Sequence, residues 1–179
     1  TVSRAFANIG LDGTGQVVNI VDSGVDHYHP FFYDKNVKVP IGTTNLNHRK
    51  IVRIEPWSDS SDHESGHGTH VVGSLLGKSY NEKAGISLYN GVAEGAKLYM
   101  TDIGKQNLKD DVSADYDLDL TCDRIKSLGS GISSNSCGYS SDPGGISYSF
   151  DLSAEEHPNI LYLAAAGNSK YGLTINCPG

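Results

Sequence analysis

The sequence is poor in several features, and each shortage excludes a class of protein. Basic side chains are in the minority: 14 Lys and Arg stand against 21 Asp and Glu in 179 residues, which gives a net charge of −7. Binding to the phosphates of nucleic acid needs a basic face, so no nucleic-acid partner is expected. No apolar run reaches the roughly 18 residues of a membrane-spanning helix, so no membrane span is expected either.

Cysteine is also scarce. Cys122, Cys137 and Cys177 make an odd count, and none of them has the paired spacing of a metal-binding cluster. Two of them could form a disulfide while the third pairs elsewhere, or all three could be reduced thiols in a reducing compartment. The sequence leaves both arrangements open.

What the sequence does contain is an alternation of apolar strands and helices. Strands are predicted over residues 17–21, 51–54, 97–103, 131–134 and 160–166, and the last of these has the composition of a buried strand. Helices are predicted over residues 67–76, 118–128 and 151–156. This alternation favours an α/β fold of three layers, α/β/α, in which helices cover both faces of a mostly parallel sheet. In such sheets the reactive groups gather at the carboxyl ends of the strands.

Three segments carry side chains suited to activating a nucleophile. The first predicted strand ends at Asp22, a helix is predicted to begin at His67, and the last predicted strand runs into Gly167-Asn168. An Asp at the end of a strand and a His on a following helix are two of the three groups of a charge-assisted catalytic triad. A side-chain amide at the end of a third segment could donate to a developing oxyanion.

These segments, in this order, resemble those of the subtilisin-like serine proteases, or subtilases. The resemblance implies that Asp22 is the orienting aspartate, His67 the general base and Asn168 the oxyanion-hole amide. The turn before the strand at 97–103 is also similar to the family's Gly-Val-Ala-Pro, with Glu94 in place of the usual Pro. The resemblance runs from about Gly13 to the end of the sequence and implies a peptide or protein substrate.

The resemblance also implies the substrate-binding residues. Ser136, Cys137 and Gly138 would pair with the backbone of an extended peptide, the mode known as strand addition. Gly167 would keep the wall of the primary specificity pocket open. Cys137 is not expected to be a nucleophile, because it falls on a substrate-pairing position rather than one that faces His67.

The nucleophile of the family lies in a Gly-Thr-Ser segment that this sequence does not contain. Its three Gly-Thr pairs, which begin at Gly13, Gly42 and Gly68, are followed by Gly, Thr and His. We therefore expect residues 1–179 to be the N-terminal portion of one subtilisin-like peptidase domain, incomplete in this chain. The nucleophilic Ser would come from a C-terminal portion of the same precursor, and the chain alone would be inactive. A catalytically inactive peptide-binding fragment or pseudoprotease is the non-enzyme alternative.

A zinc peptidase is a further alternative. His63-Glu64-Ser65-Gly66-His67 matches His-Glu-x-x-His, in which two imidazoles one helical turn apart bind zinc and the Glu is the base. That geometry needs a helix through residues 63–67. The stretch before His63 is polar, and Ser65-Gly66 is typical of a helix entry rather than of its interior, which favours the serine-protease interpretation.

No metal or cofactor is expected in the chemistry itself. Subtilases commonly bind structural calcium, but in His29-Pro30-Phe31 a Phe stands where the family usually has a carboxylate ligand, so no calcium is expected at Phe31. The aspartates between Asp110 and Asp123 are better explained as loop residues and the first turn of a helix than as a calcium loop. The resemblance alone implies a secreted, extracellular or vesicular location.

Overall fold

Five parallel strands form one sheet with helices on both faces. The computed structural model describes residues 5–63, 65–81, 85–105, 116–138 and 145–168. The strands are β1 (Val17–Asp22), β2 (Ile51–Pro56), β3 (Lys97–Asp102), β4 (Ile132–Asn135) and β5 (Leu161–Ala164), in the spatial order β2-β3-β1-β4-β5. The helices are α1 (His67–Leu76), α2 (Leu118–Ser127) and α3 (Ile146–Glu156), with short 3-10 helices η1 (Ala7–Ile9) and η2 (Ile86–Tyr89). The three-layer α/β/α fold expected from the sequence is confirmed.

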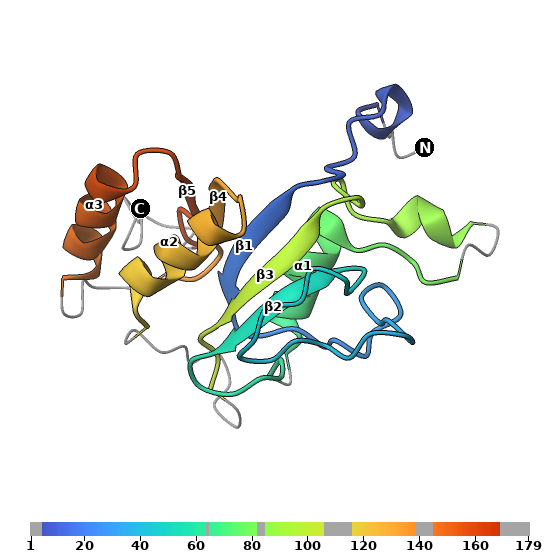
Figure 1. Cartoon of the computed structure of the whole chain (residues 1–179), viewed down its shortest axis with the longest axis horizontal. Coiled ribbons are helices and arrows are strands. Elements are labelled where there is room, and N and C mark those ends of the chain that lie inside the picture. The colour runs from blue at the N-terminus through green and yellow to red at the C-terminus, as the bar shows by residue number, and fades with distance from the viewer. Residues whose placement is uncertain (1–4, 64, 82–84, 106–115, 139–144, 169–179) are drawn as a thin grey trace.

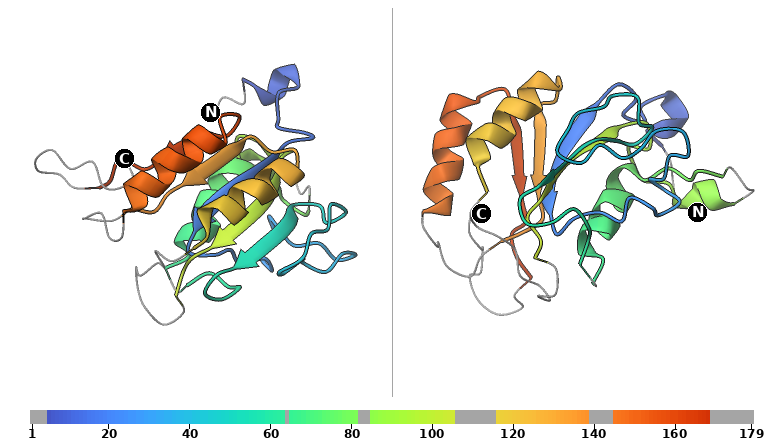
Figure 2. Two further views of the ribbon diagram at one scale, coloured as in Figure 1. Left: turned by 60° about the vertical axis from the view of Figure 1, so that its left-hand side comes forward. Right: turned by 60° about the horizontal axis from the view of Figure 1, so that its bottom comes forward.

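The helices divide between the two faces of the sheet, with α1 on one face and α2 and α3 on the other (Figures 1 and 2). Successive side chains of a strand point to opposite faces, so the strands contribute side chains to two hydrophobic cores, one on each face of the sheet. The core under α1 is the larger one and contains Val18, Ile20, Ile51, Ile54, Val72, Leu76, Leu98 and Met100. The core under α2 contains Val52, Tyr99, Leu118, Cys122, Ile125 and Ile160. In the described part of the chain, no helix is long and apolar enough to cross a membrane.

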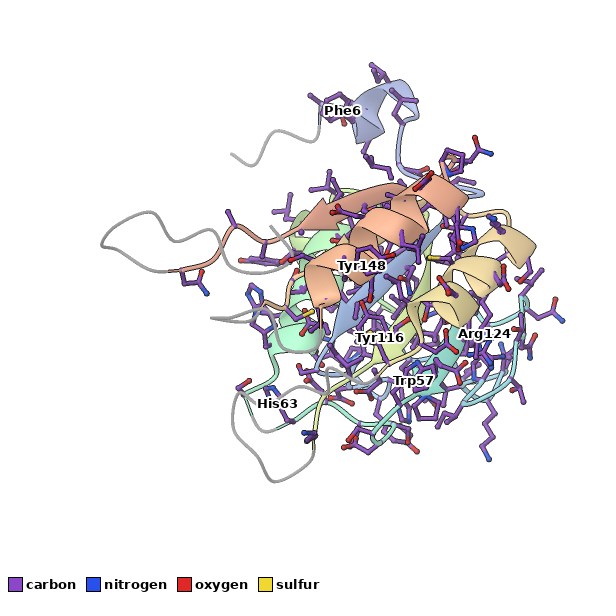
Figure 3. The ribbon with its side chains drawn as sticks, turned by 90° about the vertical axis from the view of Figure 1, so that its left-hand side faces the viewer. Phe6, Trp57, His63, Tyr116, Arg124 and Tyr148 are labelled. Atoms are coloured by element: carbon purple, nitrogen blue, oxygen red, sulfur yellow. The ribbon has the colours of Figure 1, made fainter. Side chains whose placement is uncertain are left out.

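Polar side chains join the central strands to one another and α2 to the sheet. Asn19 donates through Nδ2 to the Thr101 hydroxyl at 2.8 Å, and the Ser133 hydroxyl donates to Asn19 Oδ1 at 2.9 Å, so one amide connects β1 to both β3 and β4. On the α2 face, Arg124, which is labelled in Figure 3, forms an ion pair with the carboxylate of Glu55 on β2. The Asn19 contacts therefore join three neighbouring strands from inside the sheet, and the Arg124 contact joins α2 to β2.

The C-terminal elements differ from the prediction. Helix α3 begins at Ile146, earlier than the predicted start at residue 151. It follows Gly145, whose backbone is in the left-handed region (φ +76°), and its first turn lacks the clear apolar pattern on which the prediction relied. Strand β5 is shorter than predicted and is not buried: Leu161 is 56% exposed and Leu163 is 47% exposed. Among the described residues β5 pairs only with β4 and so lies at the edge of the described sheet, whereas its apolar composition had indicated a buried strand.

Two buried carboxyl groups end neighbouring strands at the carboxyl edge of the sheet. Asp22 closes β1 and Asp102 closes β3, and the two are partners in the strand register. Burial raises the pKa of Asp102 to about 8, and the negative charges of Asp59, Asp62 and Asp22 add to the shift, against one hydrogen bond from the Gly104 N–H. Asp102 therefore holds its proton at neutral pH, and this removes a like-charge repulsion from the side chain of Asp22.

The substitution Asp102→Asn tests this protonation through the pH dependence of stability. An unfolded Asp has a pKa of about 3.9, so the stability contributed by the raised pKa is complete below that pH and is lost as pH rises toward about 8. Asn has no proton to lose. The free energy of unfolding of the variant, relative to the wild type, should therefore increase between about pH 5 and about pH 8 in urea titrations.

Asp123→Asn is the matched control, because it removes an exposed carboxylate from α2 without touching the carboxyl edge of the sheet. A constant offset between Asp102→Asn and the wild type at both pH values would contradict a protonated Asp102.

Candidate active site

The end of β1 and the start of α1 bring an aspartate and a histidine into direct contact. Nδ1 of His67 lies 2.8 Å from Oδ1 of Asp22. The side chain of Asp22 is 3% exposed, whereas that of His67 is 53% exposed. The structure therefore joins the two residues that the sequence singled out, with the carboxylate buried and the imidazole facing solvent.

The Asp22 carboxylate is oriented by the residue that follows it. The backbone N–H of Ser23 donates to Oδ1 of Asp22 at 2.7 Å, and the Ser23 hydroxyl lies 3.2 Å from the same oxygen. Among the described residues, the second oxygen of Asp22, Oδ2, is buried without a hydrogen-bond partner. Oδ1 thus receives the backbone donor and the imidazole together, which sets the angle at which the His67 ring is held.

The first turn of α1 is capped by side chains from other segments. Gly66, at the N-cap position, has no side chain to offer. Instead the Gly68 N–H donates to the Ser23 hydroxyl at 3.0 Å, and the Thr69 N–H donates to Oδ2 of Asp62 at 2.7 Å. The hydroxyl of Ser23 in turn lies 2.7 Å from Oδ1 of Asp62. These contacts satisfy N–H groups that a helix leaves open at its N-terminus, and the carboxylate also interacts favourably with the helix dipole.

Gly68, which follows His67, is required for steric reasons. A Cβ on Gly68 would overlap the carbonyl oxygen of Gly24, in the turn that follows β1. Only glycine allows α1 to approach that turn closely enough for Nδ1 of His67 to reach Asp22. The His-Gly-Thr pattern is therefore a packing requirement of this junction as well as a sequence signature.

The predicted substrate-binding residues follow β4 at the same edge of the sheet. Ser136 and Cys137 are half-buried, and Gly138 is exposed. Burial and the charge of Asp22 raise the pKa of the Cys137 thiol to about 12. The thiol is therefore neutral, the opposite of what a cysteine nucleophile needs. Cys122 and Cys137 are both free, and Cys177 lies outside the described residues.

Asn168 and Gly167 follow β5, the neighbour of β4. Both are exposed, and Gly167 has a φ of +100°, in the region that favours glycine. Because all five strands are parallel, the segment with Asn168 leaves the sheet at the same edge as Asp22. Among the described residues, no hydrogen bond joins Asn168 to Asp22 or His67.

The helix that a zinc-peptidase site requires is not formed. Helix α1 begins at His67 after Gly66 in the left-handed region (φ +66°), and His63 lies in the preceding loop (Figure 3). The ring of His63 contacts the Ser65 hydroxyl, with 2.8 Å between Nδ1 and Oγ. Glu64 lies outside the described residues. Since His63 and His67 are not on one helix, nothing here supports the zinc alternative.

Sequence reasoning missed three residues of this site: Ser23, Asp62 and Asp102. Ser23 in Asp-Ser-Gly has the composition of an ordinary turn, and Asp62 belongs to a polar loop with no apparent role. Asp102 could have been found by the argument used for Asp22, since both end an apolar strand at its carboxyl end.

The chain is similar to curated proteases over most of its length. The serine protease/ABC transporter B family protein tagD of Dictyostelium discoideum is 34% identical over 176 residues, which cover 94% of this chain and 10% of that protein. The related tagB of the same organism is 33% identical over 179 residues, covering 94% and 9%. Bacillopeptidase F of Bacillus subtilis (strain 168) is 35% identical over 101 residues, covering 52% and 6%. The chain thus spans a tenth or less of these relatives.

Solved structures agree on the fold. The psychrophilic subtilisin-like protease Apa1 from the Antarctic psychrotroph Pseudoalteromonas sp. AS-11 matches with a TM-score of 0.57 at 20% identity, over 92% of this chain and 35% of its own. The prenylagaramide maturation protease PagA matches with a TM-score of 0.53 at 20% identity, over 94% and 52%. The family model described as the subtilase family matches residues 13–179, and the chain belongs to that family of serine proteases.

Proposed function

We propose that this chain carries the orienting aspartate, the general base and the oxyanion-hole amide of a subtilisin-like serine endopeptidase. The observation that carries the proposal is the 2.8 Å contact between Nδ1 of a solvent-facing His67 and Oδ1 of a buried Asp22. This is the arrangement in which a carboxylate prepares an imidazole to remove a proton from a serine hydroxyl.

The chemistry follows from the polarity of that contact. A carboxylate can only accept, so Nδ1 of His67 is the donor and Nε2 keeps the lone pair of the neutral ring. Nε2 takes the proton of the attacking serine, and Asp22 stabilises the imidazolium that results. The same nitrogen then returns the proton to the leaving amine of the cleaved peptide bond. Neither step needs a metal or a cofactor, and no calcium is proposed at Phe31.

The nucleophile belongs to a C-terminal portion of the same precursor. Residues 1–179 would then be the N-terminal portion of one peptidase domain, inactive without the remainder. The proposal rests on family membership together with the absence of a Gly-Thr-Ser segment from this sequence. By the same family argument, the protein acts in a secreted, extracellular or vesicular setting.

The substrate is a peptide or protein bound in an extended form. Ser136, Cys137 and Gly138 continue from β4 beyond its last paired residue and would offer backbone groups to such a chain. Gly167 and Asn168 continue from β5, and the Ala165 N–H still donates to the Asn135 carbonyl at 3.0 Å. The two segments therefore leave the sheet side by side, which supports a joint site for the substrate backbone and the oxyanion.

The substitutions Asp22→Asn and His67→Ala test the triad in a longer polypeptide that contains this chain and a nucleophilic serine. Asn at position 22 keeps the shape of the side chain but favours the wrong tautomer of His67, so kcat should fall about 10⁴-fold. His67→Ala should cost at least as much, because it removes the base itself. Peptide hydrolysis is the measurement.

His70→Ala is the matched control, since His70 is an exposed histidine one turn further along α1, and its loss should leave kcat within about twofold. A serine-reactive fluorophosphonate should label the wild-type protein. Activity that survives this reagent but not a zinc chelator would replace the proposal with the zinc peptidase. Neither labelling nor hydrolysis would indicate an inactive peptide-binding protein.

The substitution Asn168→Ala tests the oxyanion role separately. Loss of one oxyanion-hole donor typically lowers kcat by about 10²- to 10³-fold, because the interaction strengthens only as negative charge develops in the transition state. KM should change little for the same reason. Asn159→Ala, an exposed asparagine before β5, is the control. An equal loss in both variants would point to a general effect on β5 rather than to the oxyanion.

A further inference from the structure

A second cluster of polar side chains lies between α2 and α3, which are neighbours on one face of the sheet (Figures 1 and 2). Asp119 is in the first turn of α2, Glu156 is the last residue of α3, and His157 follows at its C-cap. One nitrogen or oxygen atom from each of the three side chains lies within 4.8 Å of the other two. The fold thus brings together residues far apart in the sequence.

His157 is the unusual member of this cluster. It is only 7% exposed, and among the described residues its Nδ1 is buried without a hydrogen-bond partner. A buried polar atom that has lost its water and gained no partner costs free energy, so such atoms are rare in folded proteins. Asp119 and Glu156 are exposed, so an ion can reach the cluster from solvent.

We propose that Asp119, Glu156 and His157 bind a divalent transition-metal ion, with zinc as the best match. One imidazole nitrogen with two carboxylate oxygens is a donor set that suits zinc, whereas calcium and magnesium prefer oxygen alone. Ligand atoms about 2.1 Å from zinc in a tetrahedral site lie about 3.4 Å apart. The three atoms, which lie within 4.8 Å of one another, would therefore approach by at most about 1.4 Å, which rotamer changes of the two exposed carboxylates can supply.

The ion would act on structure rather than on catalysis. It would link the start of α2 to the end of α3. His157 also lies in the turn just before β5, where its carbonyl accepts a hydrogen bond from the Ile160 N–H at 3.0 Å. Helix α1, which carries His67, covers the opposite face of the sheet (Figure 2). The site is therefore separate from the Asp22–His67 pair, and it does not depend on the proposed protease activity.

Calorimetric titration with zinc chloride, on the chelator-treated longer polypeptide that contains this chain, tests the proposal. Loss of even an outer-shell partner typically weakens metal binding about 10- to 100-fold, so Asp119→Asn and His157→Gln should each weaken zinc binding at least tenfold. The matched controls are Asp123→Asn, an exposed aspartate one turn along α2, and Glu155→Gln, the exposed neighbour of Glu156. Both controls should bind zinc as tightly as the wild type does.

A second measurement, of stability toward urea, separates zinc bound at this site from zinc bound at other histidines, and it does not require the His157 variant to fold. Zinc should raise the urea midpoint of the wild type, because the ion binds only the folded site, and this rise should be lost in Asp119→Asn and in Glu156→Gln. Those two exposed positions decide the matter if His157→Gln fails to fold. No zinc binding to the wild type at about 100 μM, or equal binding by the wild type, Asp119→Asn and Glu156→Gln, would overturn the proposal.

Discussion

The junction between the end of β1 and the start of α1 is the constraint on which the candidate site depends. Oδ1 of Asp22 holds His67, while the adjacent Ser23 and the loop residue Asp62 cap the first turn of the same helix. Hydrogen bonds to a charged group contribute about 1.5–3 kcal/mol each, and an N-cap contributes about 1 kcal/mol. The bonds that start α1 and the bond that orients its first side chain therefore form one network, so the helix cannot shift without moving the imidazole.

This junction concentrates acidic groups at one edge of the sheet, and each is accommodated in a different way. Asp22 receives a backbone N–H and the imidazole, and Asp62 faces the positive end of α1. Asp102 accepts one hydrogen bond, from the Gly104 N–H, and its Oδ2 is buried without a partner among the described residues. Burial and the neighbouring carboxylates raise its pKa, which keeps it protonated at neutral pH. Asp22, which has the Ser23 N–H and the imidazole on one oxygen, is the carboxylate that contacts His67.

The sequence predicted the elements near this junction well because their ends carry chemical signals. Strand β1 stops at an Asp before a Gly turn, and α1 begins at the predicted residue, His67. The strand predicted over residues 160–166 is present as β5, but the burial expected from its composition is not observed, since an apolar run looks the same whether the strand is central or at an edge. The prediction also could not assign Ser23, which contacts Asp62 and Gly68 at separations of 39 and 45 positions, or Asp62, which lies in a polar loop seven positions before its partner Thr69. Pattern identifies elements and candidate site residues, whereas capping partners depend on contacts that the pattern does not show.

The residues of the candidate site differ in how directly they are positioned relative to one another. His67 and Asp22 touch, so their geometry is set by one hydrogen bond. Asn168 is related to them only through the sheet, from β1 to β4 by register and from β4 to β5 by a second register. Strand β5 has a neighbour on one side only among the described residues, and the turn that enters it is where His157 lies. A strand on the open side of β5, or an ion at the end of α3, would therefore act on the position of Asn168 rather than on the contact between Asp22 and His67.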